Sequence, residues 1–378
     1  MGTTVTIGHS VGAKCMEQAE KIIGNTITLF MGIAVAFTVI LVVLVKPIVV
    51  LIATPQEAVA GTSIYLLICF IGIPFITAYN IISSIFRGLG DSKSPMYFIG
   101  IACVMNIALD YLFMGAFHMG AAGAALGTVC AQTFSVLVAL WVIRRRKTGI
   151  SLKKSDFKIE RAVIGQVLKI GIPVALQDGF IQVAFMIITV IANSRGVSDA
   201  AAVGVVEKVI SALFIVPSSM LATVSALSAQ NLGAGKEKRA TDTLRYATVI
   251  TTIYGVIVAV LIQFIAENVV GIFTSDTTVV TMGSAYIRSY IWDCIFAGIH
   301  FSFSGYFAAC GKSYIGFLHN IISITFVRVP GSYLASKYFT DTLYPMGLAA
   351  PAGSLVSVAI CVTAFILLKR KSRVAQTV

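Results

Sequence analysis

The sequence predicts an all-α polytopic membrane protein, and three observations support this class. Apolar residues make up 57% of the chain and charged residues only 12%, with a mean hydropathy of +0.92. Soluble domains carry roughly 25% charged residues. The apolar residues gather in segments long enough to cross a bilayer, and the basic residues gather in alternate loops between them. A nucleic-acid partner for the net charge of +12 is therefore not expected.

Ten segments have the length of a membrane span, since a helix needs roughly 20 mostly apolar residues to cross the hydrocarbon core. A shorter stub before Gly12 precedes them. The ten predicted spans are 22–45, 59–85, 95–116, 120–143, 164–192, 200–229, 244–267, 281–308, 314–336 and 346–368.

The orientation follows from the distribution of Lys and Arg. The side that holds Lys14 and Lys21 receives 21 of the 28 basic residues, including the run 144–147. Three lie on the other side (Lys46, Arg195, Lys337), and four lie in or at the edge of spans (Lys169, Lys208, Arg288, Arg328). The positive-inside rule makes the basic side cytoplasmic, so we expect a cytoplasmic C-terminus.

An internal repeat relates the two halves of the chain. A shift of 221 positions superimposes SVGAKCMEQA (10–19) on NLGAGKEKRA (231–240) and keeps spans, loops and turn glycines in phase for eighty residues more. The pairs Met119-Gly120 and Met346-Gly347 continue the match after a slip of six residues. Because both copies have the same orientation, we expect two bundles related by a pseudo-twofold axis along the membrane normal, which is typical of secondary transporters.

Residues 162–221 have no counterpart in the first half, because position 222 corresponds to position 1. We therefore expect two six-helix bundles of which the first lacks its first helix and most of its second. This predicts an incomplete N-terminal lobe over 1–147, a basic cytoplasmic linker over 148–161 and a C-terminal lobe of six spans over 162–378.

Several motifs carry a family resemblance. They are IGHSVGA (7–13), FRGLGDSKSPMY (86–97), NIALDYLF (106–113), GAAGAALGTVCAQ (120–132), KIGIPVALQ (169–177) and SALSAQNLGAG (225–235). With them, the chain resembles the multidrug and toxic compound extrusion (MATE) family over essentially its whole length.

The resemblance implies an antiporter rather than an enzyme, with no cofactor. A small-molecule substrate, often a cationic amphipathic drug, would leave the cytoplasm while sodium ions or protons enter and the two lobes alternate their access. It also implies a monomer in a bacterial-type plasma membrane, in contact with membrane lipids.

Four acidic residues fall inside spans: Asp110, Asp178, Glu207 and Asp293. Ionisable groups within a bilayer are costly and are therefore functional candidates. Asn106 lies one turn before Asp110 on the same helix face. One branch of the family combines an Asn and an Asp at this spacing with a Thr on the next helix as a cation site, so the resemblance implies Asn106, Asp110 and Thr128. The alternative is that Asp110 is a hydrogen-bonded structural acid.

The C-terminal half offers a second set of candidates for ion coupling or substrate contact. Asp178 and Gln182 share a helix face, as do Asp293 and His300, and Glu207 is the third acid. Asp178 and Asp293 each lie about one turn before the positions that other branches of the family use. Ion pairs with Lys208, Arg288 or Arg328 are the alternative for all three acids.

Other side chains offer weaker signals. His9, His118 and His319 lie near span ends with no predicted partner, and the seven cysteines have no metal-site spacing. Residues that could line a cavity for flat cationic drugs are Phe180, Phe185, Met186, Tyr254, Tyr290 and Phe296.

Two rival interpretations stay open. One is a lipid or polysaccharide-precursor flippase of the same superfamily, which would need a basic cavity for pyrophosphate. The other is a truncated chain without activity.

Overall fold

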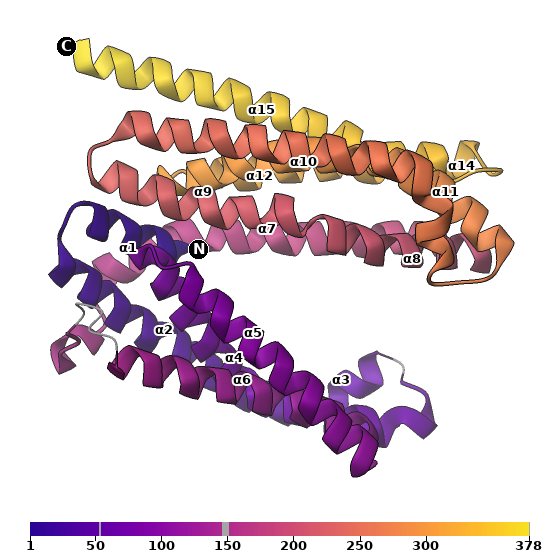
Figure 1. Ribbon diagram of the computed structural model, residues 1–378, viewed down its shortest axis with the longest axis horizontal. Helices are drawn as coiled ribbons and strands as arrows, with labels where there is room; N and C mark the ends of the chain where they lie inside the picture. The colour runs from indigo at the N-terminus through magenta and orange to yellow at the C-terminus, as the bar shows by residue number, and fades with distance from the viewer. Residues whose placement is uncertain (53, 146–150, 378) are drawn as a thin grey trace. The chain divides into compact units, whose positions relative to one another are not determined.

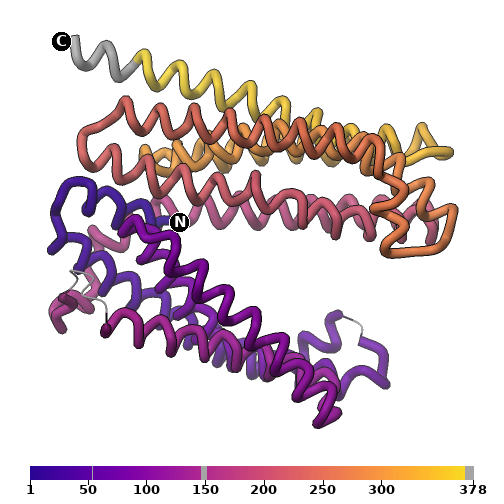
Figure 2. The backbone as a smooth tube through the Cα atoms, viewed as in Figure 1, coloured from indigo at the N-terminus to yellow at the C-terminus, as the bar shows by residue number. Residues whose placement is uncertain are grey.

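The computed structural model describes residues 1–52, 54–145 and 151–377, with side chains as far as residue 370. Every regular element within these residues is a helix (Figures 1 and 2). The chain divides into two compact units. Unit 1 consists of Met1–Val5 and Leu168–Val378, and unit 2 consists of Thr6–Val167, so the helix over residues 2–12 and the helix over residues 161–193 each belong partly to both units and are described below with the unit that holds most of their residues.

Unit 2 is built mainly from long apolar helices. A π-helical turn, η1, directly continues α5, and a short 3-10 helix, η2, lies in the basic linker. The elements are α1 (Gly2–Gly12), α2 (Met16–Val43), α3 (Val45–Leu51), α4 (Gln56–Leu89), α5 (Lys93–Asp110), η1 (Tyr111–Ala116), α6 (Gly120–Arg145) and η2 (Lys154–Phe157).

The helices of unit 1 are interrupted more often than those of unit 2. The elements of unit 1 are α7 (Arg161–Asn193), α8 (Val197–Leu213), α9 (Ile215–Gly233), α10 (Glu237–Gly271), α11 (Thr277–Tyr290), α12 (Asp293–Ala309), α13 (Ser313–Ser323), the π-helical η3 (Ile324–Arg328), α14 (Val329–Tyr338) and α15 (Tyr344–Thr377).

The apolar spans predicted from the sequence largely coincide with these helices. In the described part of the chain, eight helices are long and apolar enough to cross a membrane, against ten predicted spans. The other two predicted spans, 281–308 and 314–336, are interrupted at residues 291–292 and at η3. The hydropathy pattern does not detect these breaks, because residues 291–292 are Ile and Trp and η3 contains a single charged residue, so each segment remains apolar on average.

The helix ends follow the internal repeat. α1 ends at Gly12 and α9 at Gly233, while α2 begins at Met16 and α10 at Glu237, each pair 221 positions apart. Gly90 and Gly311, also 221 positions apart, both adopt the left-handed conformation after a helix, with φ of 92° and 69°. Glycine is favoured there because it has no Cβ.

The part of the linker that the structure describes packs on α2 within unit 2. The Asn25 amide nitrogen donates to the Asp156 carbonyl at 3.1 Å, and the Asn25 side-chain oxygen accepts from the Glu160 amide at 2.7 Å. Thr28 donates to the carbonyl of Phe157 at 3.0 Å. Residues 146–150 of the predicted basic run and linker lie outside the described residues. The remainder is a docked segment, which buries Asn25 to 1% exposure.

Candidate functional site

Asn106 and Asp110 come together on the last turn of α5 in unit 2, where Asp110 is followed directly by the π-helical turn η1. Both face Gly127 of α6. A Cβ on Gly127 would collide with Oδ1 of Asp110, and it would lie 3.3 Å from Cγ of Asp110 and 3.5 Å from Nδ2 of Asn106. The absence of a side chain at Gly127 therefore makes the space for the carboxylate.

This pair carries unused hydrogen-bonding capacity. Nδ2 of Asn106 and Oδ1 of Asp110 are buried and have no hydrogen-bond partner in the described part of the protein. Buried polar atoms are nearly always paired, so such exceptions point to a water, an ion or a catalytic role. Of these two atoms, Oδ1 of Asp110 is a hard acceptor that suits a small cation or a proton, whereas Nδ2 of Asn106 is a hydrogen-bond donor.

Thr128, the third predicted member, follows Gly127 but is directed elsewhere. Its side chain is exposed, and its hydroxyl donates to the carbonyl of Ala124 at 3.1 Å. The structure thus brings Asn106 and Asp110 together against Gly127, while the Thr128 hydroxyl is bonded to its own helix.

Three further polar atoms in unit 2 share this property. The Tyr79 hydroxyl and the Ser83 hydroxyl on α4, and Oε1 of Gln132 on α6, are buried without a partner among the residues described. The sequence interpretation did not select them. The sequence contains a pattern that could have identified two of them, because Tyr79 and Ser83 are spaced one turn apart on a single helix face.

Arg328 lies at the centre of a charged cluster within unit 1. Its guanidinium lies 5.0 Å from the ring centroid of Phe185 and 5.5 Å from that of Tyr290, and it donates to the Tyr290 hydroxyl. Asp293 lines the same small cavity as Arg328, and Glu207 lies within electrostatic range of it, but neither carboxylate is within ion-pair distance of Arg328 among the residues described. Of the ion-pair alternatives drawn from the sequence, Arg328 is the one that the structure places near two of the acids.

The two acids differ in their hydrogen bonds. Glu207 on α8 accepts from the Thr189 hydroxyl at 3.3 Å. Asp293, the first residue of α12, is 1% exposed, and its Oδ1 has no partner within the described ranges. A cavity of about 50 Å³ opens beside Asp293, and its polar lining comes from Asp293, His300, Asn320, Ser323, Arg328, Ser354 and Ser357.

His319 corrects one expectation from the sequence. It was expected near a span end without a partner, but it is fully buried, and its Nε2 lies 2.8 Å from the Ser304 hydroxyl. Its ring lies 5.3 Å from that of His300, whose Nε2 is 3.5 Å from the Ser354 hydroxyl. Packing of α13 on α12 produces this pair, and sequence spacing cannot show which helices pack.

The remaining candidates lie outside this cluster. Asp178 and Gln182 are exposed on α7. Arg288 pairs with Glu267 at 3.3 Å rather than with Asp178, Glu207 or Asp293. Among the predicted cavity residues, Phe185 and Tyr290 contact Arg328, the Tyr254 hydroxyl donates to the Leu213 carbonyl at 2.9 Å, and Met186 is 68% exposed.

Comparison with known proteins gives consistent results. A model of the MatE family matches residues 1–112 and 173–334. The chain is 30% identical to the "Probable multidrug resistance protein YpnP" of Bacillus subtilis (strain 168) over 92% of its own length and 77% of that protein. It is 24% identical to the "Multidrug export protein MepA" of Staphylococcus aureus (strain MSSA476), over 82% and 69% of the two chains.

A solved structure shares the fold. It is described as the "Outward-facing conformation of a multidrug resistance MATE family transporter of the MOP superfamily", with a TM-score of 0.92 and 19% identity, and the match covers 98% of this chain and 84% of that one. The fold and these matches define a multi-pass membrane transporter. The chain belongs to the MATE family.

Proposed function

We propose that the chain exports drugs or organic cations in exchange for sodium ions or protons, with Asp110 as the coupling acid. The observation that carries this proposal is the buried, unsatisfied pair of Asn106 and Asp110 beside Gly127. The names of the relatives in Bacillus subtilis and Staphylococcus aureus support a drug as the exported substrate.

In this proposal, ion binding and transport are coupled through the carboxylate of Asp110. A bound cation or proton neutralises Asp110, and its release restores a buried charge that costs free energy unless it is paired. The relative stability of the inward-open and outward-open states would therefore depend on whether Asp110 holds a cation or a proton. In the proposed arrangement the lobes are related by an axis along the membrane normal, the protein is a plasma-membrane monomer and its C-terminus is cytoplasmic.

Glu207, Asp293 and His300 form a second candidate site in unit 1. Their proximity to Arg328 also supports the alternative, in which Glu207 and Asp293 act as structural counter-charges.

Arg328 bears on the flippase hypothesis as well. A pyrophosphate site needs several free positive charges, whereas Arg328 donates to the Tyr290 hydroxyl and has two acids within electrostatic range. Drug export is therefore the better supported proposal.

The test is transport in reconstituted vesicles. The 378-residue protein and its Asp110→Asn variant are loaded into vesicles with a fluorescent organic cation, under either a sodium or a proton gradient. We expect gradient-driven efflux by the unmodified protein and its loss in Asp110→Asn. The exposed loop variant Asp341→Asn serves as a control that should keep full activity.

Three outcomes contradict the proposal. Coupled efflux by Asp110→Asn would reject Asp110 as the coupling acid. Movement of a labelled lipid-linked diphosphate without drug efflux would support the flippase. Absence of both activities in correctly folded protein would support a chain without transport activity.

A further inference from the structure

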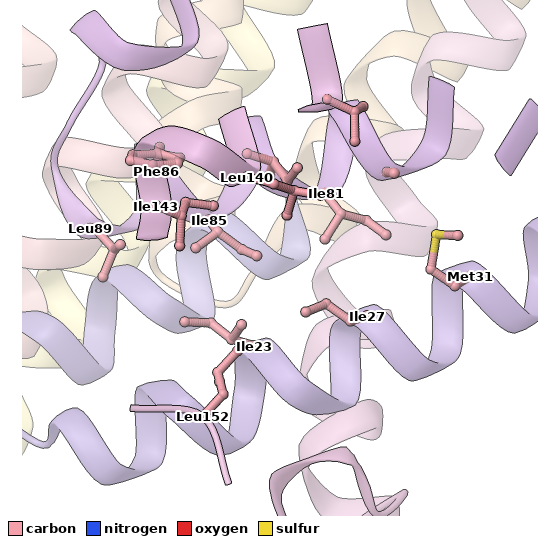
Figure 3. Close-up of a pocket in the computed structure, with 13 residues that line it drawn as sticks. Ile23, Ile27, Met31, Ile81, Ile85, Phe86, Leu89, Leu140, Ile143 and Leu152 are labelled. Atoms are coloured by element: carbon pink, nitrogen blue, oxygen red, sulfur yellow. The ribbon is translucent and has the colours of Figure 1, made fainter. Parts of the chain in front are cut away.

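An apolar pocket of about 440 Å³ lies within unit 2, between α2, α4, α6 and the linker. All thirteen lining residues are hydrophobic, and Figure 3 shows their side chains directed toward a common space. Ile23, Ile27 and Met31 come from α2, Ile85 from α4, Leu140 from α6 and Leu152 from the linker. The volume is within the usual range of roughly 300–1,000 Å³ for ligand sites.

Basic residues follow two of the pocket's lining residues in the sequence. The lining residue Leu152 is 40% exposed and is followed by the exposed Lys153 and Lys154. The lining residue Ile143 is followed by the exposed Arg144 and Arg145 at the end of α6. Two lining residues are thus each followed in the sequence by two exposed basic residues.

Hydrogen bonds fix the linker beside the pocket. The amide of Ser151 donates to Oε1 of Glu20 at 2.7 Å, and the amide of Lys153 donates to Oδ2 of Asp156 at 2.7 Å. Leu152 lies between these two anchored amides, so its position over the pocket is part of the fold.

The corresponding positions of unit 1 have larger side chains. Counting with the repeat, Phe303, Tyr306 and Phe365 stand where unit 2 has Ile82, Ile85 and Val138. The ring of Phe365 lies 5.7 Å from that of Phe303 and 5.5 Å from that of Tyr306, so aromatic rings pack together at these positions. The groove beside them is lined by charged residues such as Glu237, Lys238 and Asp242. Of these two repeat-related positions in the described residues, the one in unit 2 has a wholly apolar pocket.

We propose that this pocket of unit 2 binds one acyl chain of an anionic phospholipid, whose phosphate contacts Lys153 and Lys154. An acyl chain has no hydrogen-bonding groups, so an apolar cavity can hold it without leaving a buried polar group unpaired. Basic pockets on the cytoplasmic side of membrane helices attract anionic headgroups. The chemistry of both parts of the site thus matches the two parts of one lipid molecule.

Trp141 provides the measurement. It lies beside the lining residue Leu140, is 55% exposed and is one of two tryptophans in the chain. In a Trp292→Phe background, its fluorescence reports quenching by brominated acyl chains. The protein is reconstituted in phosphatidylcholine vesicles with a small fraction of brominated phosphatidylglycerol or, in parallel, of brominated phosphatidylcholine.

We expect brominated phosphatidylglycerol to quench Trp141 at several-fold lower concentration than brominated phosphatidylcholine. Lys153→Gln and Lys154→Gln should each reduce this preference by about fivefold, which corresponds to the attraction of one basic residue to an anionic surface. Lys46→Gln, an exposed lysine of α3 in the same unit, should leave the preference unchanged.

A filling variant tests the apolar part. Ile82→Phe with Ile85→Tyr copies the side chains of unit 1, and it should abolish the selective quenching. Ile99→Phe, on an exposed position of α5, is the matched control. Native mass spectrometry of the unmodified protein gives a readout that needs no variant, and it should show one retained phosphatidylglycerol.

The proposal is overturned if both brominated lipids quench equally, if the filling variant keeps the preference, or if a hydrophobic drug is retained in place of lipid. None of these measurements requires transport. Their outcome is therefore independent of the proposed antiport.

Discussion

The carboxylate of Asp110 on α5 packs against the bare Cα of Gly127 on α6, so that any side chain at position 127 would occupy the space of the carboxylate oxygen. This contact links the turn that carries the candidate coupling acid to the helix beside it. A substitution at position 127 therefore tests the site as directly as a substitution of Asp110.

Gly127→Ala is expected to reduce gradient-driven efflux at least about tenfold, because the added methyl group displaces Asp110. Overpacking of this kind costs about 1–3 kcal/mol, so the variant should still fold. The measurement is efflux from vesicles together with the melting temperature in detergent. Gly100→Ala on α5, where a Cβ would have no neighbour within 4 Å, is the control. Full activity of Gly127→Ala would exclude a tight carboxylate site.

Asn106 and Thr128 are expected to differ in their contributions. Asn106→Ala removes the buried amide next to Asp110 and should eliminate coupled efflux, whereas Thr128→Ala should keep at least about half of it, because the Thr128 hydroxyl bonds to its own helix. The ion dependence of efflux by each variant is the measurement. A larger loss in Thr128→Ala than in Asn106→Ala would show that the threonine joins the site during transport.

Removal of Arg328 should destabilise unit 1. Arg328→Met leaves the Tyr290 hydroxyl without its donor and removes a nearby positive charge from Glu207 and Asp293, and a lost hydrogen bond to a charged group costs about 2 kcal/mol. Adding Glu207→Gln should restore part of this loss, because one uncompensated acid is then neutral. Thermal unfolding of the single and double variants measures it. If the two changes are simply additive, Arg328 and Glu207 are not coupled in the folded protein.

The linker should detach when Asn25 is changed. Asn25→Ala removes both hydrogen bonds that Asn25 makes to Asp156 and Glu160. Each lost bond costs about 1 kcal/mol, so local opening should increase at least about tenfold. Trypsin cleavage after Lys158, followed by mass spectrometry, measures the opening.

Asn80→Ala is the control for this experiment, since among the described residues the Asn80 amide donates within its own helix, to the carbonyl of Ile76 at 2.9 Å. An unchanged cleavage rate in Asn25→Ala would mean that other contacts, such as Thr28 to Phe157, hold the linker.

The sequence alone determined the class of protein, the order of its apolar helices, the internal repeat and the family. These properties are encoded locally. Each span needs a certain number of consecutive apolar residues, and each turn glycine needs only its own backbone conformation. The pairing of Asn106 with Asp110 was predictable for the same reason, because four residues on one helix fix their spacing.

The tertiary structure alone decided which distant residues meet. Asp178, Glu207 and Asp293 were equivalent candidates by sequence, yet Glu207 and Asp293 share Arg328 while Asp178 is exposed on α7. The partner of His319, the close approach of Gly127 and the pocket beside Leu152 depend likewise on how helices cross. Apolar surfaces pack in many registers of similar hydrophobicity, and only the shape of the complete set of side chains selects one of them.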